Sequence, residues 1–341
     1  MRAYKCLSKQ VYELNEYSVV PIRNEDRMSI MQWRNEQIYH LRQNTPLTVD
    51  DQNKYFETAI EALFDQDQPD QLLFSYLKNG ICIGYGGLVH ISWKDKNAEI
   101  SFVLKTSLEK DHFEDHWVVY LSLIEQVGFT ELQFYKIYTY AFDLRPLLYT
   151  ALARAGFKKE AVLVDHCRFG NDFVDILIHT KYNETIMAIK NKQVCLRDAV
   201  IEDAELLYTW VTEKSVRNNS IDQHLISWEN HLTWFRNKLT DSSSGIYILE
   251  TKSNHYPLGQ IRIDLNDGFW SIDYSIDFRF RGTGLGREII KQLMQKYPRY
   301  NYRAIVKNHN VASSKVFYSL GFTKMKSKDL AFLTFSYNNV K

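Results

Sequence analysis

The sequence predicts an α/β (α+β) protein of two tandem domains, each with a mixed, mostly antiparallel twisted sheet flanked by helices. Three observations lead to this prediction. The 341 residues are enough for two ordinary domains. Apolar residues recur with the period of a strand in some stretches and with the period of a helix in others. The order of these stretches in the first half returns in the second, and a repeat of about 150 residues indicates tandem domains rather than a solenoid.

Both halves open with the same succession of features. A short β-run ending in Arg begins near Val19 and again at Val194, and each leads into an amphipathic stretch that reaches Trp33 or Trp210. A hydroxyl further on is expected to cap a helix, because it can accept a hydrogen bond from a free N–H group. Each half has an Arg, this N-cap and an aromatic pair: Arg42, Thr48 and Tyr55-Phe56 in the first, Arg217, Ser227 and Trp234-Phe235 in the second.

The parallel continues through the rest of each half. Period-2 alternation with Gly or Asn turns predicts a β-hairpin, which is followed by a strand, a helix, a further strand and a helix ending in Gly-Phe. The corresponding segments are the hairpins 72–93 and 245–265, the strands 98–104 and 270–276, and the helix ends Gly156-Phe157 and Gly321-Phe322. We expect a first domain over 1–183, a linker over 184–192 within a polar stretch that could be partly helical, and a second domain over 193–341.

The composition excludes several classes of protein. The 42 basic and 41 acidic residues leave no charge excess of the kind that binds nucleic acid or an anionic membrane. No apolar run approaches the ~20 residues of a membrane span, and the N-terminus lacks the apolar core of a signal peptide. The cysteines have no metal-binding spacing and are expected to be free thiols, so we expect a cytoplasmic protein. The cysteines are Cys6, Cys82, Cys167 and Cys195.

A glycine-rich stretch, RGTGLG (281–286), stands between a predicted strand that runs to Phe280 and a predicted helix. A glycine-rich turn before a helix leaves unpaired backbone N–H groups and the positive helix end facing one spot, which suits phosphate oxygens. Arg281 and Arg287 flank the turn, so a diphosphate is the expected ligand. The spacing GxGxG fits neither the dinucleotide fingerprint GxGxxG nor the Walker loop. The helix is indicated by apolar residues at helical spacing: Ile289, Ile290, Leu293, Met294 and Tyr297.

Two motifs of the second half occur in the order and spacing of a known family. Arg281, Gly284 and Gly286 match a loop of the form Arg/Gln-x-x-Gly-x-Gly/Ala, and NVASSKVFYSLGF (310–322) matches an Asn, then Ala or Ser, then a helix ending in Gly-Phe. With both motifs the chain resembles the GNAT superfamily of acetyl-CoA-dependent N-acetyltransferases. The resemblance implies an acyltransferase with acetyl-CoA as co-substrate and no metal. It also implies contacts to acetyl-CoA from Ile276, Arg281, Gly282, Thr283, Gly284, Leu285, Gly286, Arg287, Asn310 and Ser313.

The first half resembles the family in layout but lacks these motifs. EKDHFED (109–115) stands where the glycine loop would be. Carboxylates beside a diphosphate would repel it by ~1 kcal/mol per pair even in high dielectric, so we expect a degenerate domain that has lost this mode of CoA binding. Glu99 takes the position of the family's base and is interpreted as an exposed strand residue. His112 and His116 could hold a metal, but an acidic first helical turn explains this sequence without one.

The resemblance also implies which groups move protons. GNAT chemistry needs one group to take a proton from the attacking amine and another to return one to the thiolate. The family's base lies where this chain has Ser271, and Asp273, two residues on and on the same strand face, is predicted to replace it. The family's tyrosine position is Phe317, so Tyr318, about 100° further round the helix, is the predicted acid. A water or an unassisted thiolate is the alternative to Tyr318, and His309 is a second candidate base or a solvated loop residue.

The acceptor side of GNAT domains is formed by their first helices. Here that segment resembles acetyltransferases of nucleotide-linked amino sugars, and also ribosomal-protein Nα-acetyltransferases. Aromatic faces suit sugar rings and a guanidinium can meet a nucleotide phosphate, so we expect a nucleotide-linked amino sugar for surface polysaccharide as the acceptor. The expected acceptor contacts are Trp210, Arg217, His231 and Trp234.

Other interpretations of the same residues stay open. Trp210 and Trp234 fit the core of an amphipathic helix equally well. The acceptor could be a protein N-terminus, and the chain could be a non-catalytic CoA-binding scaffold, since a fold does not imply its chemistry. No nucleic acid or membrane partner is expected, and the sequence leaves the oligomeric state open.

Overall fold

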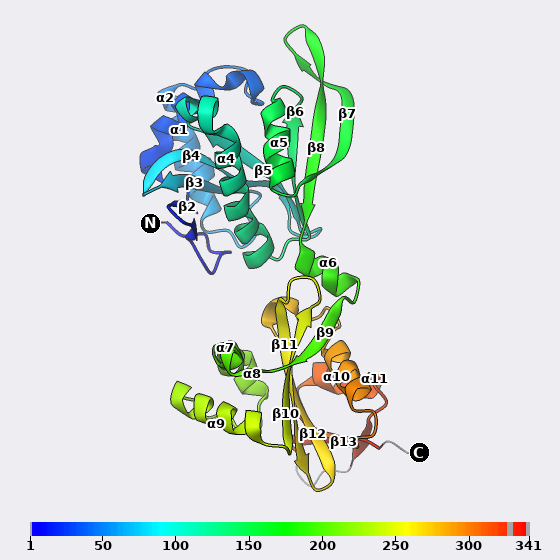
Figure 1. Cartoon of the computed structure of the whole chain (residues 1–341). Helices are drawn as coiled ribbons and strands as arrows, with labels where there is room; N and C mark the ends of the chain where they lie inside the picture. The colour runs from blue at the N-terminus through cyan, green and yellow to red at the C-terminus, as the bar shows by residue number, and fades with distance from the viewer. Residues whose placement is uncertain (1, 326–329, 339–341) are drawn as a thin grey trace. The chain divides into compact units, whose positions relative to one another are not determined.

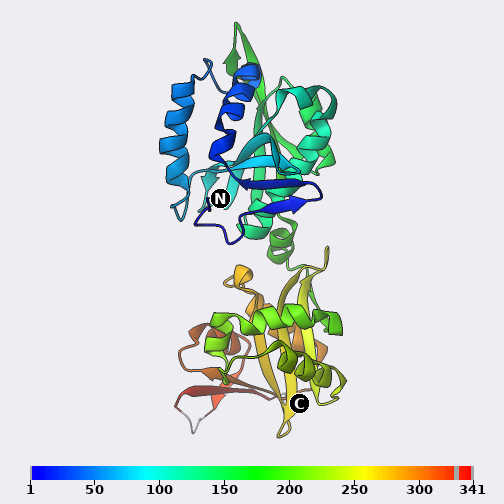
Figure 2. The ribbon, with the colours of Figure 1, turned by 90° about the vertical axis from the view of Figure 1, so that its left-hand side faces the viewer.

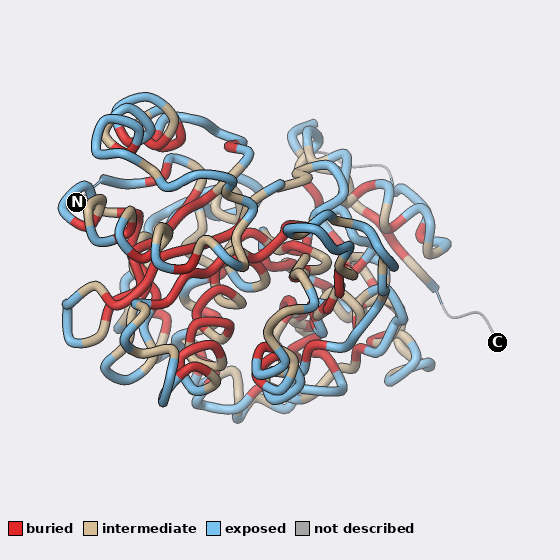
Figure 3. Tube along the Cα trace, turned by 90° about the horizontal axis from the view of Figure 1, so that it is seen from above, coloured by how far each residue is buried: buried red, intermediate tan, exposed pale blue. Residues whose placement is uncertain are grey.

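The computed structural model of the chain describes residues 2–325 and 330–338. The residues group into two compact units, 1–184 and 185–341, and each unit has one sheet with helices against it (Figure 1). Buried stretches run along the strands and the inner sides of the helices, while turns are exposed (Figure 3). The prediction of two α/β domains in tandem, each with a mixed, mostly antiparallel sheet, is confirmed.

The first unit has an eight-stranded sheet in the order β1-β2-β3-β4-β5-β6-β8-β7. Its neighbouring strands are antiparallel except for β5 and β6. The strands are β1 (Tyr12–Leu14), β2 (Tyr17–Pro21), β3 (Leu72–Lys78), β4 (Ile81–Ser92), β5 (Asn97–Leu104), β6 (Lys136–Phe142), β7 (Lys158–Phe169) and β8 (Asp172–Tyr182).

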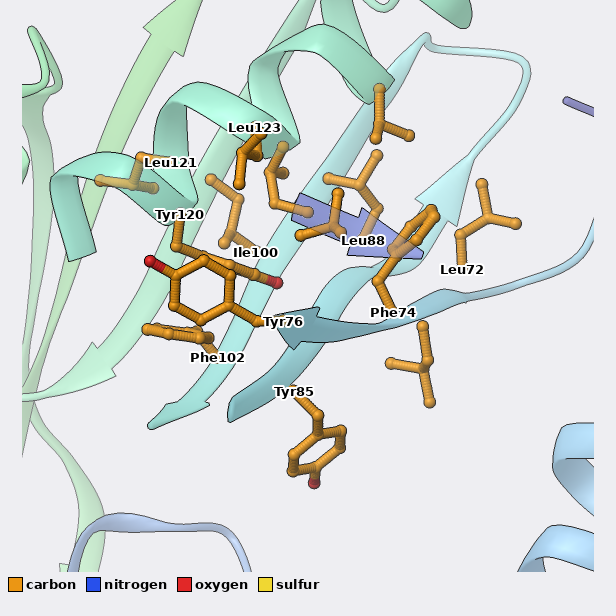
Figure 4. Close-up of a cluster of buried hydrophobic side chains, with 14 of the residues drawn as sticks. Leu72, Phe74, Tyr76, Tyr85, Leu88, Ile100, Phe102, Tyr120, Leu121 and Leu123 are labelled. Carbon is orange, nitrogen blue, oxygen red and sulfur yellow. The ribbon is translucent and has the colours of Figure 1, made fainter. Parts of the chain in front are cut away.

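Helices cover both faces of this sheet (Figures 1 and 2). They are α1 (Arg27–Glu36), α2 (Val49–Tyr55), α3 (Glu61–Leu63), α4 (Thr106–Glu125) and α5 (Pro146–Arg154). The predicted cap at Thr48 is confirmed, because its side chain accepts the N–H of Asp51 at the start of α2. Beneath α4, Tyr76, Phe102 and Tyr120 pack together in the core (Figure 4).

The second unit has a seven-stranded sheet in the order β14-β15-β13-β12-β11-β10-β9. Only β12 and β13 run parallel among its described neighbouring strands. The strands are β9 (Val194–Asp198), β10 (Ser244–Thr251), β11 (Pro257–Asn266), β12 (Phe269–Ile276), β13 (Tyr302–Lys307), β14 (Thr323–Met325) and β15 (Phe332–Tyr337).

Two groups of helices pack on opposite faces of the second sheet, α7–α9 on one and α10 and α11 on the other (Figures 1 and 2). Ser227 caps α9 as predicted, since its side chain accepts the N–H of Asn230. The predicted linker contains α6, whose Ile186 and Ile189 pack on the core of the second unit. The helices are α6 (Glu184–Lys190), α7 (Ala204–Thr212), α8 (Lys214–Asn219), α9 (Trp228–Thr240), α10 (Leu285–Lys296) and α11 (Val311–Ser319).

The parallel pair in each sheet separates after a few residues. β12 pairs with β13 only at Trp270 and Ser271, so the backbone groups of residues 272–276 on that edge have no strand partner. β5 pairs with β6 only over Asn97, Ala98 and Glu99. Because buried backbone N–H and C=O groups need partners, each gap is a place where a ligand can complete the hydrogen bonding.

The strand before the glycine loop is shorter than predicted. It ends at Ile276 rather than at Phe280, and residues 278–280 form a 3₁₀ turn. The Asp277 side chain accepts the N–H of Arg279 at 3.0 Å, and this local bond replaces the strand ladder. The loop therefore begins with a rigid turn instead of a free strand end.

Two further expectations concern the chain as a whole. The four cysteines are free and partly buried, as predicted. No helix in the described part of the chain is both long and apolar enough to cross a membrane.

Candidate functional site

A cleft of about 510 Å³ opens in the second unit where β12 and β13 part. One wall is the unpaired edge of β12, and the opposite wall is formed by β13 and the first turn of α11. The glycine loop and the start of α10 close one end, and α8 contributes polar side chains. The predicted acetyl-CoA contacts that line it are Ile276, Arg281, Gly282, Gly284, Gly286, Arg287, Asn310 and Ser313.

The glycine loop holds its conformation through positive backbone angles. Gly282 has a φ of 80° and Gly284, the N-cap of α10, has a φ of 87°. Only glycine adopts this region without strain, and a Cβ at either position would meet no protein atom within 4 Å. The space above the loop is thus open to a ligand. Arg287 and Glu288 already donate their backbone N–H groups to the Gly284 carbonyl, so Leu285 and Gly286, at the start of α10, carry the backbone N–H groups that a ligand there can take.

The two arginines that flank the loop have different partners. Arg281 donates to both carboxylate oxygens of Glu213 (3.0 and 2.5 Å) and, through Nε, to the carbonyl of Ile276 (2.9 Å). Its charge is therefore already balanced, and its role is to tie the loop to the segment before α8. Arg287 is exposed, lines the cleft, and has no side-chain partner in the described ranges. Of the two flanking arginines, Arg287 is therefore the one whose charge is not balanced within the part of the protein that the structure describes.

Trp210 donates a hydrogen bond to the turn that precedes this loop and does not face an acceptor. It is buried, and its indole N–H donates to Asp277 at 3.0 Å. The same carboxylate accepts from the Arg279 guanidinium at 2.8 and 2.9 Å. Burial opposes ionisation of Asp277, but these hydrogen bonds outweigh it and lower the pKa of that carboxyl group. The acceptor role predicted for Trp210 is corrected, because the apolar face of α7 turns it into the core.

Two remaining predicted contacts to acetyl-CoA do not reach the cleft. Leu285 is buried in the core under the first turn of α10, and Thr283 donates its hydroxyl to the carbonyl of Phe280 at 2.6 Å. Asn310 reaches the cleft but acts as the cap of α11, where its side chain accepts the N–H of Ser313. Leu285, Thr283 and Asn310 thus stabilise the glycine loop and the start of α11.

The two faces of β12 carry different side chains into the cleft. Asp273 points toward the face covered by α7–α9, is largely exposed, and pairs with Arg262 at 3.2 Å. Tyr274 points to the other face, where it is half-buried and its hydroxyl donates to Ser313 Oγ at 3.2 Å. Burial raises the pKa of Tyr274 above its ordinary value of 10.0. Sequence reasoning missed Tyr274, although strand alternation from Asp273 would have placed it on the α10 side.

Tyr318 lies outside the cleft, which corrects its predicted role as the acid. Its ring is half exposed and packs edge-on against Phe335 of β15. Phe317, one position earlier on α11, lines the cleft. A rotation of about 100° per residue is enough to carry Tyr318 off that face. His309 is exposed and does not line the cleft either.

The other three predicted acceptor residues, His231, Arg217 and Trp234, do not line the cleft. His231 is buried, with Nε2 bonded to the carbonyl of Ala204 at 2.9 Å, so its acceptor role is corrected to a core role. Arg217 donates to the carbonyls of Asp222 and His224 and shapes the loop after α8. Trp234 is half-buried beside Arg262, whose guanidinium lies 5.2 Å from its ring centroid. Trp234 reaches the acceptor side only through Arg262.

The first unit has no counterpart of the glycine loop: α4 begins at Thr106, two residues after β5 ends, so residues 109–115, which the sequence placed at the loop, lie inside this helix. An ion pair stands in the first turn of the helix. The Arg145 guanidinium, just before α5, donates to Glu109 of α4 at 2.5 Å and lies 4.5 Å from the Phe113 ring centroid. Glu99 is buried, not exposed as expected, and its carboxylate accepts a hydrogen bond from Arg42 and contacts His90, which compensates a charge at a buried position. The described residues contain no cluster suited to a metal ion.

Two family models match the chain, and both are described as an acetyltransferase (GNAT) domain. One covers residues 19–178 and the other residues 193–323. The chain therefore belongs to the GNAT acetyltransferases, with two such domains in tandem, and it is an acyltransferase. No curated protein matches the sequence.

Several solved structures resemble one domain of the chain. A spermidine N-acetyltransferase from Vibrio cholerae, solved with CoA and spermine, is 15% identical over 51% of this chain and 99% of its own, with a TM-score of 0.45. RimJ from Mycobacterium smegmatis, solved with CoA-disulfide, is 18% identical over 49% of this chain and 82% of its own, with a TM-score of 0.41. A GNAT-family acetyltransferase from Bacillus anthracis is 13% identical over 51% of this chain and 99% of its own, with a TM-score of 0.42. These likenesses concern the fold alone.

Proposed function

We propose that the second unit transfers the acetyl group of acetyl-CoA to the primary amine of a small molecule. The observation that carries this proposal is that one cleft holds both the glycine loop before α10 and the unpaired edge of β12. The loop offers N–H groups to a diphosphate, and the strand edge offers its N–H and C=O groups to the amides of a pantetheine chain. When bound there, acetyl-CoA supplies an activated acetyl thioester.

Asp273 is the proposed base. It is the one carboxylate among the described residues that line the cleft, and it lies on the acceptor face of β12. Its negative charge attracts an ammonium group, and a carboxylate in contact with that group can take its proton before the amine attacks. Arg262 at 3.2 Å fixes the orientation of the carboxylate.

Tyr274 is the proposed proton donor, because it is the one phenol among the described residues that line the cleft. Since burial raises its pKa above 10.0, it stays protonated at neutral pH and can donate. We expect Tyr274→Phe to lower kcat by about 10-fold or more, while Tyr318→Phe leaves kcat unchanged. Steady-state kinetics of both variants checks this. Equal losses, or a loss only in Tyr318→Phe, would contradict the assignment.

The acceptor we propose is a nucleotide-linked amino sugar. Polar uncharged side chains of the α8 region line the cleft, namely Ser215, Asn219 and Ser220, and these suit sugar hydroxyls. Asp273 gives one anionic contact, enough for one ammonium group but not for the several charges of a polyamine.

An acetyl-CoA consumption assay tests this acceptor. The panel holds UDP- and dTDP-linked amino sugars, spermidine and peptides with free N-termini, and we expect the highest kcat/KM for an amino sugar nucleotide. Turnover of peptides alone would overturn the proposal in favour of N-terminal acetylation of a protein. Acetyl-CoA binding without turnover of any amine would favour a non-catalytic scaffold.

A further inference from the structure

The first unit has a cleft of its own, of about 410 Å³, where β5 and β6 part. Acetyl-CoA does not account for it, because α4 follows β5 without a glycine loop and carries in its first turn a carboxylate, Glu109, which is paired with Arg145. The cleft is nevertheless lined by a concentration of charged and aromatic side chains. The partners of those charges indicate what the cleft can hold.

Most charges that line this cleft are already balanced. Glu99 accepts from Arg42 Nη2 at 2.8 Å through one oxygen and contacts His90 Nδ1 at 2.9 Å through the other. Arg145 is paired with Glu109 at 2.5 Å. His40 also lines the cleft, and burial, with the Arg145 charge beside it, lowers its pKa to about 3, so it is neutral at pH 7.

Arg34 is the exception. This half-buried arginine of α1 lines the cleft and has only neutral partners among the described residues. Its Nε donates to Gln43 Oε1 at 2.9 Å, and its Nη1 donates to the Tyr85 hydroxyl at 2.7 Å. One positive charge in the cleft is therefore without a counter-charge, and a partly buried charge is costly unless it is paired.

Apolar side chains adjoin Arg34 on the same face of the sheet. Tyr85 projects from β4 on the side away from α4 (Figure 4). Leu73, which pairs with Gly87, and Val89 lie on that face too, because alternate residues of a strand share a face. Both line the cleft. The site thus combines one guanidinium, one phenol hydroxyl and an apolar wall.

We propose that this cleft binds a small organic monocarboxylate with an apolar body. The carboxylate pairs with Arg34 and accepts a hydrogen bond from the Tyr85 hydroxyl, and the body packs on Leu73 and Val89. A monoanion is favoured over a phosphate, because one uncompensated guanidinium balances one negative charge. The site is opposite in sign to the Asp273 face of the second unit, so the two units are built for different ligands.

Isothermal titration of the full chain with phenylacetate tests the proposal, with phenylacetamide as the neutral isostere. We expect phenylacetate to bind at one site and phenylacetamide to bind at least 10-fold more weakly. Arg34→Gln is expected to weaken phenylacetate binding at least 10-fold and to leave the affinity for phenylacetamide unchanged. Inorganic phosphate is titrated alongside, and tighter binding of phosphate than of phenylacetate would overturn the choice of a monocarboxylate.

Arg27→Gln is the matched control. Arg27 lies on the same helix, is half-buried, and donates to the side chains of Asn53 and Asn24, but it does not line the cleft. We expect it to bind phenylacetate like the wild type. Circular dichroism shows whether Arg34→Gln folds. If it does not, Tyr85→Phe replaces it as the test, because this variant keeps the ring and removes only the hydroxyl. We expect Tyr85→Phe to weaken phenylacetate binding severalfold. No binding of phenylacetate at millimolar concentration, equal binding of the amide, or equal losses in Arg27→Gln and Arg34→Gln would each overturn the proposal. None of these results depends on acetyl transfer by the second unit.

Discussion

Replacing Asp273 by Asn is expected to lower kcat by ~10²-fold or more while acetyl-CoA still binds. The amide keeps the shape of the side chain and a hydrogen bond to Arg262, which is 3.2 Å from the carboxylate. It removes the negative charge that attracts the ammonium group and the basicity that deprotonates it. Because Asp273 lies on the acceptor side of β12, apart from the glycine loop, the affinity for acetyl-CoA should change little. Initial rates with saturating acetyl-CoA, together with calorimetry of acetyl-CoA binding, measure both effects.

Glu99→Gln is the control for the choice of unit. Glu99 is a buried carboxylate of the first unit at the corresponding strand, and it is already paired with Arg42. We expect this variant to turn over acceptor like the wild type. Loss of turnover in Glu99→Gln, with Asp273→Asn still active, would place the chemistry in the first unit and refute the assignment.

Gly284→Glu is expected to abolish acetyl-CoA binding. The wild-type chain should bind one acetyl-CoA, because only the second unit has the glycine loop, and calorimetry should show no binding to the variant. Two causes act together. A residue with a Cβ is strained at a φ of 87°, and the carboxylate would stand in the open space over the loop, where the diphosphate is expected. The negative charge of the glutamate would then repel the negative charges of the diphosphate.

Gly268→Glu separates these two causes. Gly268 lies in the turn between β11 and β12 with a φ of 77°, and a Cβ there also meets no atom within 4 Å. The backbone strain is therefore similar, but this residue does not line the cleft. We expect Gly268→Glu to lower the melting temperature by about as much as Gly284→Glu and to keep its affinity for acetyl-CoA. Binding of two acetyl-CoA molecules per chain, or unchanged affinity in Gly284→Glu, would contradict the loop assignment.

Local features of the fold were predictable from the sequence. Thr48 and Ser227 cap their helices because a cap depends on hydrogen bonds between residues three positions apart. The helix that begins at Leu285 follows from apolar spacing within one segment. The strand end at Ile276 was not predictable from alternation, because the turn begins with a side chain, Asp277, that competes with the ladder.

Two copies of one fold, and a glycine-rich loop in the second copy alone, were recognisable from the amino-acid sequence. Those features depend on residues that are adjacent or at fixed short spacing, so backbone angles and periodicity are enough to specify them. Which side chains meet in the cleft could not be recognised in this way. Arg281 pairs with Glu213, 68 positions away, and Tyr274 reaches Ser313, 39 positions away, while His231 is buried against α7. Such contacts join segments that are distant along the chain, and packing of the whole sheet and its helices sets their geometry.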